Sequence, residues 1–249
     1  MPKRVLLVIL LFLIIFLTSQ FTQRVAHSEV DCLMCHEQLS KEKVVHPALS
    51  MGCPTCHSAI DAKDIPHKKT NNIPKGLSSE QPALCFNCHD KAMFSKKTVH
   101  PALGMGCTVC HNPHSSKNAK LLNSEPPDLC FNCHDRAEFS KKDVHPPVAG
   151  GMCTTCHNPH STDFTSLLLK DVNSLCFNCH TEPDLKSGLH VVRGFTTGGH
   201  PVKGKTDPKR QSKEFSCVSC HTPHSSDSIR LFRYKAQSLF ELCVHCHEK

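Results

Sequence analysis

Every cysteine of this chain belongs to a short motif in which two cysteines, three positions apart, are followed directly by a histidine. The 249 residues include 18 cysteines, which form nine Cys-x-x-Cys-His motifs. This motif is typical of covalent haem attachment. Its residues share one helical turn, so two thiols can bond to the vinyl groups of one porphyrin while the imidazole reaches its iron. The sequence therefore predicts nine covalently bound c-type haems.

The motif residues divide into two sets of expected haem ligands. The thioether-forming cysteines are Cys32, Cys35, Cys53, Cys56, Cys85, Cys88, Cys107, Cys110, Cys130, Cys133, Cys153, Cys156, Cys176, Cys179, Cys217, Cys220, Cys243 and Cys246. The histidines expected to bind iron on the proximal side are His36, His57, His89, His111, His134, His157, His180, His221 and His247. Other interpretations explain less, because disulfides need no histidine, a thioredoxin-like pair occurs once, and zinc modules combine two cysteine pairs around one ion.

The composition cannot supply an ordinary protein core. The chain has no Trp, one Tyr and 6% aromatic residues, and its 39% hydrophobic residues include all the cysteines. Such a polypeptide buries too little apolar surface to offset its conformational entropy, so we expect disorder without haem. The formal net charge of +7 omits the haem propionates. The basic residues are therefore no evidence for nucleic-acid binding, and no nucleic-acid motif is present.

The N-terminal residues are first basic and then apolar. Lys3 and Arg4 precede 13 consecutive apolar residues at positions 5–17. This pattern is typical of a secretory signal, and we expect residues 1–28 to be a signal peptide. The alternative is an uncleaved anchor that associates the protein with a membrane, although the apolar stretch is short for a bilayer. Either predicts export to the periplasm, the outer membrane or the cell exterior, where c-type haem is attached in bacteria.

The motifs alternate between two types. The first type follows a leucine, as at residues 84–90, and the second type leads into a Pro-His step, as at residues 106–116. A His-Pro step lies between a first-type motif and the next second-type motif. Residues 29–249 are therefore expected to be one haem-binding domain built from two-haem repeats. The repeats span about residues 32–84, 85–129, 130–175 and 176–242, with a half-unit at 243–249.

Twenty histidines are present for nine predicted irons. The His-Pro and Pro-His steps supply eight candidates for the distal ligand, and His190 is the candidate for the haem at Cys243. The expected distal ligands are His46, His67, His100, His114, His145, His160, His200, His224 and His190. His111 and His114 project the same way on a helix, so His114 is expected to serve a different haem. His245 lies between two thioether cysteines and is poorly aimed, and His27 lies in the N-terminal segment.

Secondary structure is expected to be sparse. Seventeen prolines interrupt the chain, and no segment after the N-terminal residues has sustained helix or strand periodicity. The predicted fold is mostly irregular, with short α-helices at the motifs and little or no sheet, wound round an elongated stack of covalent haems. Residues 181–216 are rich in Gly and Lys, which indicates a surface loop. Such a loop is either a docking element or a tolerated insertion.

The alternating Leu-Cys-x-x-Cys-His and Cys-x-x-Cys-His-x-Pro-His-Ser units resemble multihaem c-type cytochromes of the doubled-CXXCH, cytochrome c3-like group. The resemblance covers nearly all of the chain after the N-terminal segment. It implies electron hopping along closely spaced bis-histidine haems in anaerobic or extracellular respiration. The implied partners are other cytochromes, a quinol-oxidising membrane complex or an outer-membrane porin–cytochrome complex.

Two other functional classes fit the same motifs. A multihaem reductase of a small nitrogen or sulfur oxyanion requires one haem with an open iron position, and the repeat assigns no distal ligand to the haem at Cys243. A charge-storage or scaffold subunit is the other class. We expect an electron carrier without catalytic residues, because all nine motifs are regular and the spare histidines outnumber the predicted irons.

Overall fold

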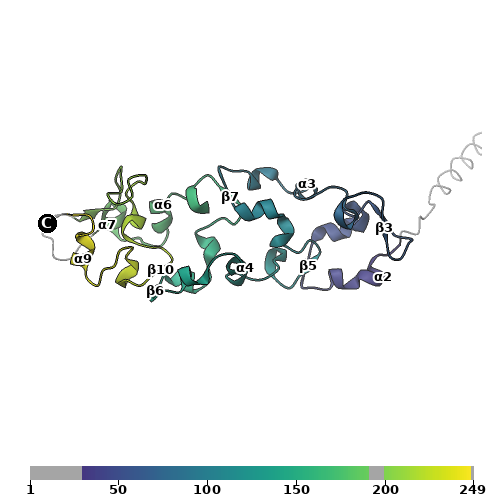
Figure 1. Cartoon of the computed structure of the whole chain (residues 1–249), viewed down its shortest axis with the longest axis horizontal. Helices are drawn as coiled ribbons and strands as arrows, with labels where there is room; N and C mark the ends of the chain where they lie inside the picture. Colours follow the sequence, from purple (N-terminus) through teal and green to yellow (C-terminus); the bar gives the residue numbers. More distant parts are fainter. Residues whose placement is uncertain (1–29, 191–198, 248–249) are drawn as a thin grey trace, which may run out of the picture.

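The body of the protein is elongated, and the chain runs along it in sequence order. The computed structural model describes residues 30–190 and 199–247, so the expected signal peptide or anchor and His27 lie outside the described residues. Figure 1 shows α2 and β3 near one end and α9 near the other. The predicted elongated and mostly irregular fold is confirmed. Within the described ranges, no helix combines the length and apolarity needed to cross a bilayer.

The helices are short because most of them contain or adjoin a Cys-x-x-Cys-His motif. The α-helices are α2 (Leu33–His36), α3 (Ala83–Phe86), α4 (Asp128–Phe131), α5 (Pro146–Ala149), α6 (Val172–Cys176), α7 (Pro183–Lys186), α8 (Cys217–Cys220) and α9 (Leu239–Cys243). The 3-10 helices are η1 (Glu37–Ser40), η2 (Pro47–Met51), η3 (Cys53–Thr55), η4 (Pro74–Gly76), η5 (Lys91–Phe94), η6 (Pro101–Met105), η7 (Cys107–Val109), η8 (Ala119–Leu121), η9 (Arg136–Phe139), η10 (Cys153–Thr155), η11 (Thr165–Leu167) and η12 (Ile229–Leu231). In every motif the histidine N–H donates to the carbonyl of the first cysteine at 2.9–3.1 Å. Each motif is therefore one helical turn, which places both thiols beside the imidazole.

Strands of two residues tie neighbouring repeats together. The antiparallel pairs in the described chain are β1 (Val44–Val45) with β5 (Ser115–Ser116), β2 (Ile60–Asp61) with β3 (Lys68–Lys69), β4 (Thr98–Val99) with β7 (Ser161–Thr162), β6 (Asp143–Val144) with β10 (Ser225–Ser226), and β8 (Leu189–His190) with β9 (His200–Pro201). In three of these pairs, the strand before a His-Pro step binds the strand after the Pro-His step of the next repeat. His46 N–H, for example, donates to the carbonyl of His114 at 2.7 Å.

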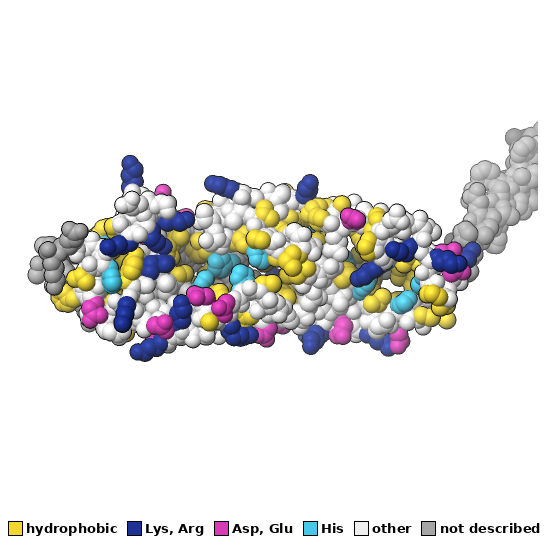
Figure 2. Space-filling model, viewed as in Figure 1, with side chains coloured by type: hydrophobic (Ala, Val, Ile, Leu, Met, Phe, Trp, Pro, Cys, Tyr) yellow, Lys and Arg dark blue, Asp and Glu magenta, His cyan; other side chains and the backbone are white. Residues whose placement is uncertain are grey.

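Very little of the polypeptide is buried. Among the described residues, the buried apolar side chains are Ala59, Val202, Phe232 and Ala236. Larger apolar side chains lie at the surface along the whole body (Figure 2), and Ile65 is 86% exposed. The protein therefore lacks an ordinary core, as its composition predicts. Backbone ladders and buried polar contacts hold the repeats in place.

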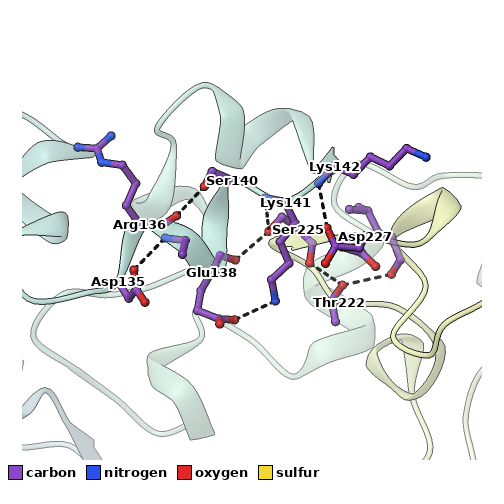
Figure 3. A network of polar contacts seen from close by, with 12 residues as sticks. Asp135, Arg136, Glu138, Ser140, Lys141, Lys142, Thr222, Ser225 and Asp227 are labelled. Carbon is purple, nitrogen blue, oxygen red and sulfur yellow. Dashed lines mark hydrogen bonds and ion pairs between the residues drawn. The ribbon is translucent and has the colours of Figure 1, made fainter.

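Buried serines make the polar contacts between repeats. Ser225 Oγ donates to the carbonyl of Glu138 at 2.8 Å and accepts from the N–H of Lys141 at 3.3 Å (Figure 3). Ser161 makes the same two contacts with Met93 and Lys96 one repeat earlier. Ser225 is 3% exposed and Ser161 is fully buried at 0%. A single hydroxyl thus satisfies two backbone groups of the neighbouring repeat.

Ser225→Ala is expected to lower the free energy of unfolding by about 1–3 kcal/mol, because the carbonyl of Glu138 and the N–H of Lys141 both lose their partner. Denaturant unfolding of the haem-loaded protein measures this loss. Ser140→Ala is the matched control, since exposed Ser140 donates to the carbonyl of Arg136 at 3.1 Å within its own turn. The control is expected to change stability by less than about 0.5 kcal/mol. Equal losses in the two variants would contradict the bridging role of Ser225.

The interpretation of residues 181–216 as a surface loop is wrong for part of the segment. It contains α7 and the β8–β9 hairpin, and Asp207 within it is only 1% exposed. The Asp207 carboxylate accepts from Arg210 Nε at 2.8 Å and from the backbone N–H of Lys209 at 2.9 Å. Arg210 also donates to the carbonyl of Val218 at 2.8 Å. A buried ion pair therefore fixes a segment whose composition suggested an irregular loop.

Candidate haem-binding sites

Each motif histidine lies beside one other histidine. The ring centroids of these pairs are 5.9–6.4 Å apart. The nine pairs are His36–His67, His46–His89, His57–His114, His100–His134, His111–His160, His145–His180, His157–His224, His190–His221 and His200–His247. An imidazole nitrogen lies about 2 Å from a metal and about 1 Å from its ring centre, so one metal between two imidazoles separates the centres by roughly 6 Å. The spacing in every pair fits one haem iron held from both sides.

The pairs contain all nine histidines expected as distal ligands, but one expected partner differs. His114 lies beside His57 and not beside His111. His190 was expected to serve the haem at Cys243, yet it lies beside His221, while His200 lies beside His247. His190 and His200 face each other across the β8–β9 hairpin. One hairpin therefore carries the histidines that lie beside the last two motif histidines. The spacing of the repeats does not reveal this arrangement.

Most pairs join different repeats. His46, before a proline, lies beside His89 of the following repeat, and the same relation recurs for His100 and His145. The Pro-His histidines reach in the opposite direction, as His114 does to His57. The hydrogen bond between His46 and His114 explains this exchange, because it holds the two histidines together where the repeats meet. In the repeats at 85–129 and 130–175, every histidine pair therefore needs a histidine from a neighbouring repeat.

Backbone carbonyls orient the motif histidines of the second type. Their Nδ1 atoms lie 2.8–2.9 Å from carbonyl oxygens in the pairs His57–Lys75, His111–Lys120, His157–Ser166 and His221–Arg230. The four residues that provide the carbonyls have φ of 55–59°, a left-handed conformation that is unfavourable for residues with side chains. An Nδ1–H donated to a carbonyl leaves Nε2 free to bind a metal. The four strained residues thus provide the carbonyls that fix the tautomer of these motif histidines.

These carbonyls were not predicted, although a signal for three of them exists in the sequence. Lys120, Ser166 and Arg230 each follow their motif histidine by nine residues, and each precedes a leucine. In the first repeat, Gly76 occupies the position of these leucines, also with positive φ. A Cβ at Gly76 would lie 2.4 Å from Ile60 Cγ1, so this repeat has no room for the leucine. The constant spacing could have identified the orienting carbonyl.

The distal histidines have a similar environment. His46 and His145 have Nδ1 atoms 3.0 Å from the carbonyls of Pro113 and Pro223. Burial lowers the pKa of His145, and it also lowers the pKa of His160 and His224. A lowered pKa favours the neutral imidazole, which is the form that binds a metal. Burial of His145, His160 and His224 therefore favours the form of these three residues that can bind a haem iron.

Thiols of successive motifs lie close together along the body. Within repeats, the thiols that lie close enough to interact are Cys32–Cys53, Cys85–Cys107, Cys130–Cys153 and Cys176–Cys217. Between repeats, electrostatic contacts join Cys56 to Cys85, Cys110 to Cys130, Cys156 to Cys176 and Cys220 to Cys243. Burial, followed by the neighbouring thiol, raises the pKa of Cys85 and Cys130 to about 11. The nine attachment motifs thus follow one another in chain order.

His245 has a different environment from the other described histidines. Its ring stacks on Tyr234 with centroids 4.9 Å apart, and its Nε2 lies 3.1 Å from the carbonyl of Lys235. It lies in none of the nine histidine pairs. The expectation that its position between Cys243 and Cys246 aims it poorly agrees with this placement. His245 therefore provides a control position for substitutions of the paired histidines.

The comparison with protein families identifies the repeat. The family model described as the doubled CXXCH motif matches residues 46–94, 100–139, 145–185 and 210–249, which is more than half of the chain. Each match contains one second-type and one first-type motif, and the motif from Cys32 to His36 precedes the first match. A search of curated proteins found no match. The chain belongs to the doubled-CXXCH-motif family, whose motifs bind c-type haem covalently.

Proposed function

We propose that this protein is an electron carrier that holds nine bis-histidine c-type haems in chain order. The observation that carries the proposal is the set of nine histidine pairs, each with one motif histidine and a spacing that fits one iron. Family membership supports covalent haem and electron transfer. The order of the thiol contacts supports a single line of attachment sites rather than a cluster.

Covalently bound haem supplies reversible one-electron chemistry at its iron. The protein residues fix where that chemistry occurs. Two cysteines would hold each haem and the paired imidazoles would both bind its iron, which would leave no position on the iron for a substrate. The carbonyls of Lys75, Lys120, Ser166 and Arg230 increase the electron density on their histidines, which favours oxidised iron. The backbone would therefore lower the reduction potential of the haems at the four second-type motifs in the same way.

The elongated body separates the first and last sites, which suits a conduit between two redox partners. We propose that these partners are other cytochromes, a quinol-oxidising membrane complex or an outer-membrane porin–cytochrome complex. The basic and apolar N-terminal segment supports a periplasmic or outer-membrane location. A conduit needs its first and last sites to be accessible to partners, and α2 and α9, which contain parts of the first and last motifs, lie near opposite ends of the body (Figure 1).

The reductase alternative requires a motif histidine without a distal partner. The haem at Cys243 was the candidate for such an open site. His200 lies 6.1 Å from His247, with the two rings inclined by 81°. Two imidazoles can bind opposite sides of a metal at any angle about the shared axis, so this spacing fits a second ligand for the haem at Cys243. That fit supports the carrier over the reductase.

A reductive titration of the purified protein under carbon monoxide tests this function. The carrier is expected to take up nine electrons per chain, one for each predicted haem, and to bind no carbon monoxide, because bis-histidine iron has no open position. A five-coordinate globin serves as the positive control. Binding of one carbon monoxide per chain would support the reductase, and uptake of far fewer electrons would contradict the haem count.

A further inference from the structure

We propose that Lys203, Lys205, Lys209 and Lys213 form a docking surface for an acidic electron-transfer protein beside the last haem site. We call these four residues the lysine patch, and its proposed role rests on the proposed function. All four are exposed. The sole acidic residue between them is Asp207, which is 1% exposed and paired with Arg210. Lys203 also has an acidic neighbour in Asp171.

The charge of the patch contrasts with the rest of the described body. Residues 30–84 contain six basic and six acidic residues, and residues 85–175 contain nine basic and eight acidic residues. By side-chain charge alone these repeats are nearly neutral, whereas the short segment 203–214 presents four exposed lysines and one exposed acid, Glu214. Figure 2 shows Lys and Arg side chains gathered over the C-terminal third of the body, beside the region of α7. The positive surface is therefore concentrated at one end.

The lysine patch is held by a closed and anchored segment. Gly204 and Phe215 exchange backbone hydrogen bonds at 3.0 and 3.1 Å, which join the two ends of the segment that carries the lysine patch. Asp207 N–H donates to the carbonyl of Lys213 at 2.8 Å, and its carboxylate binds Arg210 inside. Asp207 thereby neutralises the partly buried guanidinium of Arg210, while the four lysines are exposed. A preorganised surface loses less side-chain and backbone conformational entropy on binding than a flexible loop does.

The anchored segment lies directly against the last histidine pair. The Phe215 ring packs against His200 with centroids 5.7 Å apart, and His200 pairs with His247. Lys209 lies within electrostatic reach of exposed Cys246, one of the two thioether positions of that site. A partner bound to the lysine patch would therefore sit next to the last attachment point. Proximity is what an electron-transfer partner requires.

Charge identifies the occupant of the lysine patch, because a cluster of lysines steers the encounter with a partner of opposite charge. An acidic protein fits this surface better than a membrane does, because the patch itself contains no large apolar side chain to insert.

The test compares the quadruple variant K203Q/K205Q/K209Q/K213Q with the matched control K43Q/K91Q/K96Q/K97Q. Both remove four exposed lysines, so both change the net charge equally. Binding to immobilised flavodoxin, a small acidic electron-transfer protein, is measured over a range of salt concentrations. The patch variant is expected to associate about tenfold more slowly at low salt and to lose most of its salt dependence. The control is expected to stay within about twofold of the unmodified protein.

Three outcomes would overturn the docking surface. They are equal weakening in both variants, no weakening in the patch variant, and binding to phosphatidylglycerol vesicles without binding to flavodoxin. The haem stoichiometry and absorption spectrum of both variants are recorded in parallel. If these are unchanged while flavodoxin binding is unaffected, the docking surface fails and the proposed function stands. Missing haem in the unmodified protein would instead contradict the proposed function.

Discussion

Replacing His224 by alanine is expected to create one carbon monoxide site per chain, and the site lies in a different repeat from the substitution. His224 belongs to the repeat at 176–242, but its ring lies 5.9 Å from His157 in the repeat at 130–175. Removing it leaves the iron expected at the Cys153 motif with one axial ligand. Reduced five-coordinate haem binds carbon monoxide, so the reduced-plus-CO difference spectrum should rise from zero to one equivalent.

The control for this experiment is His245→Ala. His245 stacks on Tyr234 outside the histidine pairs, so its loss is expected to leave every iron six-coordinate. Added imidazole should restore the low-spin spectrum of the His224→Ala protein without restoring any backbone contact. If His224→Ala binds no carbon monoxide and retains the unmodified spectrum, His224 is not a haem ligand, and the exchange of ligands between repeats fails.

His114→Met is expected to raise the reduction potential of one haem by an amount on the order of 100 mV, because a thioether ligand favours reduced iron. The affected haem is expected at the Cys53 motif, since His114 lies beside His57. Methionine is flexible enough to occupy the partly buried position of His114. Spectroelectrochemical titration should show one component displaced from the others. His245→Met is the control and is expected to displace none; a titration curve of His114→Met that matches the unmodified protein would contradict the assignment.

The local chemistry of this protein was predictable because it is encoded within a few consecutive residues. Cys-x-x-Cys-His forms one helical turn wherever it occurs, as Cys85 to His89 illustrates, so the positions of the thiols and motif histidines follow from sequence. The scarcity of aromatic residues likewise predicted the absence of an ordinary core. Alternation of two motif types predicted units of two motifs. The family model also matches two motifs at a time, but each match begins with the second-type motif, half a unit away from the predicted repeats.

Pairing of the histidines was not predictable, because it depends on contacts between distant segments. The ring of His46 is positioned by the carbonyl of Pro113, which is 67 residues away. No feature near His46 in the sequence specifies that contact. The exchange between His190 and His200 depends in the same way on the β8–β9 hairpin. Hydrogen bonds between distant segments, rather than the spacing of the motifs, determine which histidine lies beside each motif histidine.

Residues 181–216 were misinterpreted for a different reason. Gly and Lys are abundant in exposed loops, and a composition-based prediction counts both as loop residues. The segment is held instead by the ion pair of buried Asp207 with Arg210, which lies within residues 203–213, where no aliphatic or aromatic side chain is present to reveal it. Two charged residues three positions apart are common on surfaces. Burial of such a pair becomes visible only when the surrounding fold is known.

The intact mass of the purified protein tests the central claim most directly. Peptide mapping first fixes the N-terminus, so that the polypeptide mass is known. The 18 cysteines in nine motifs predict a mass equal to that polypeptide plus nine haems, with no free thiol. A mass that corresponds to fewer haems, to disulfides, or to bound zinc that is lost on denaturation would contradict the assignment of all nine motifs as haem sites.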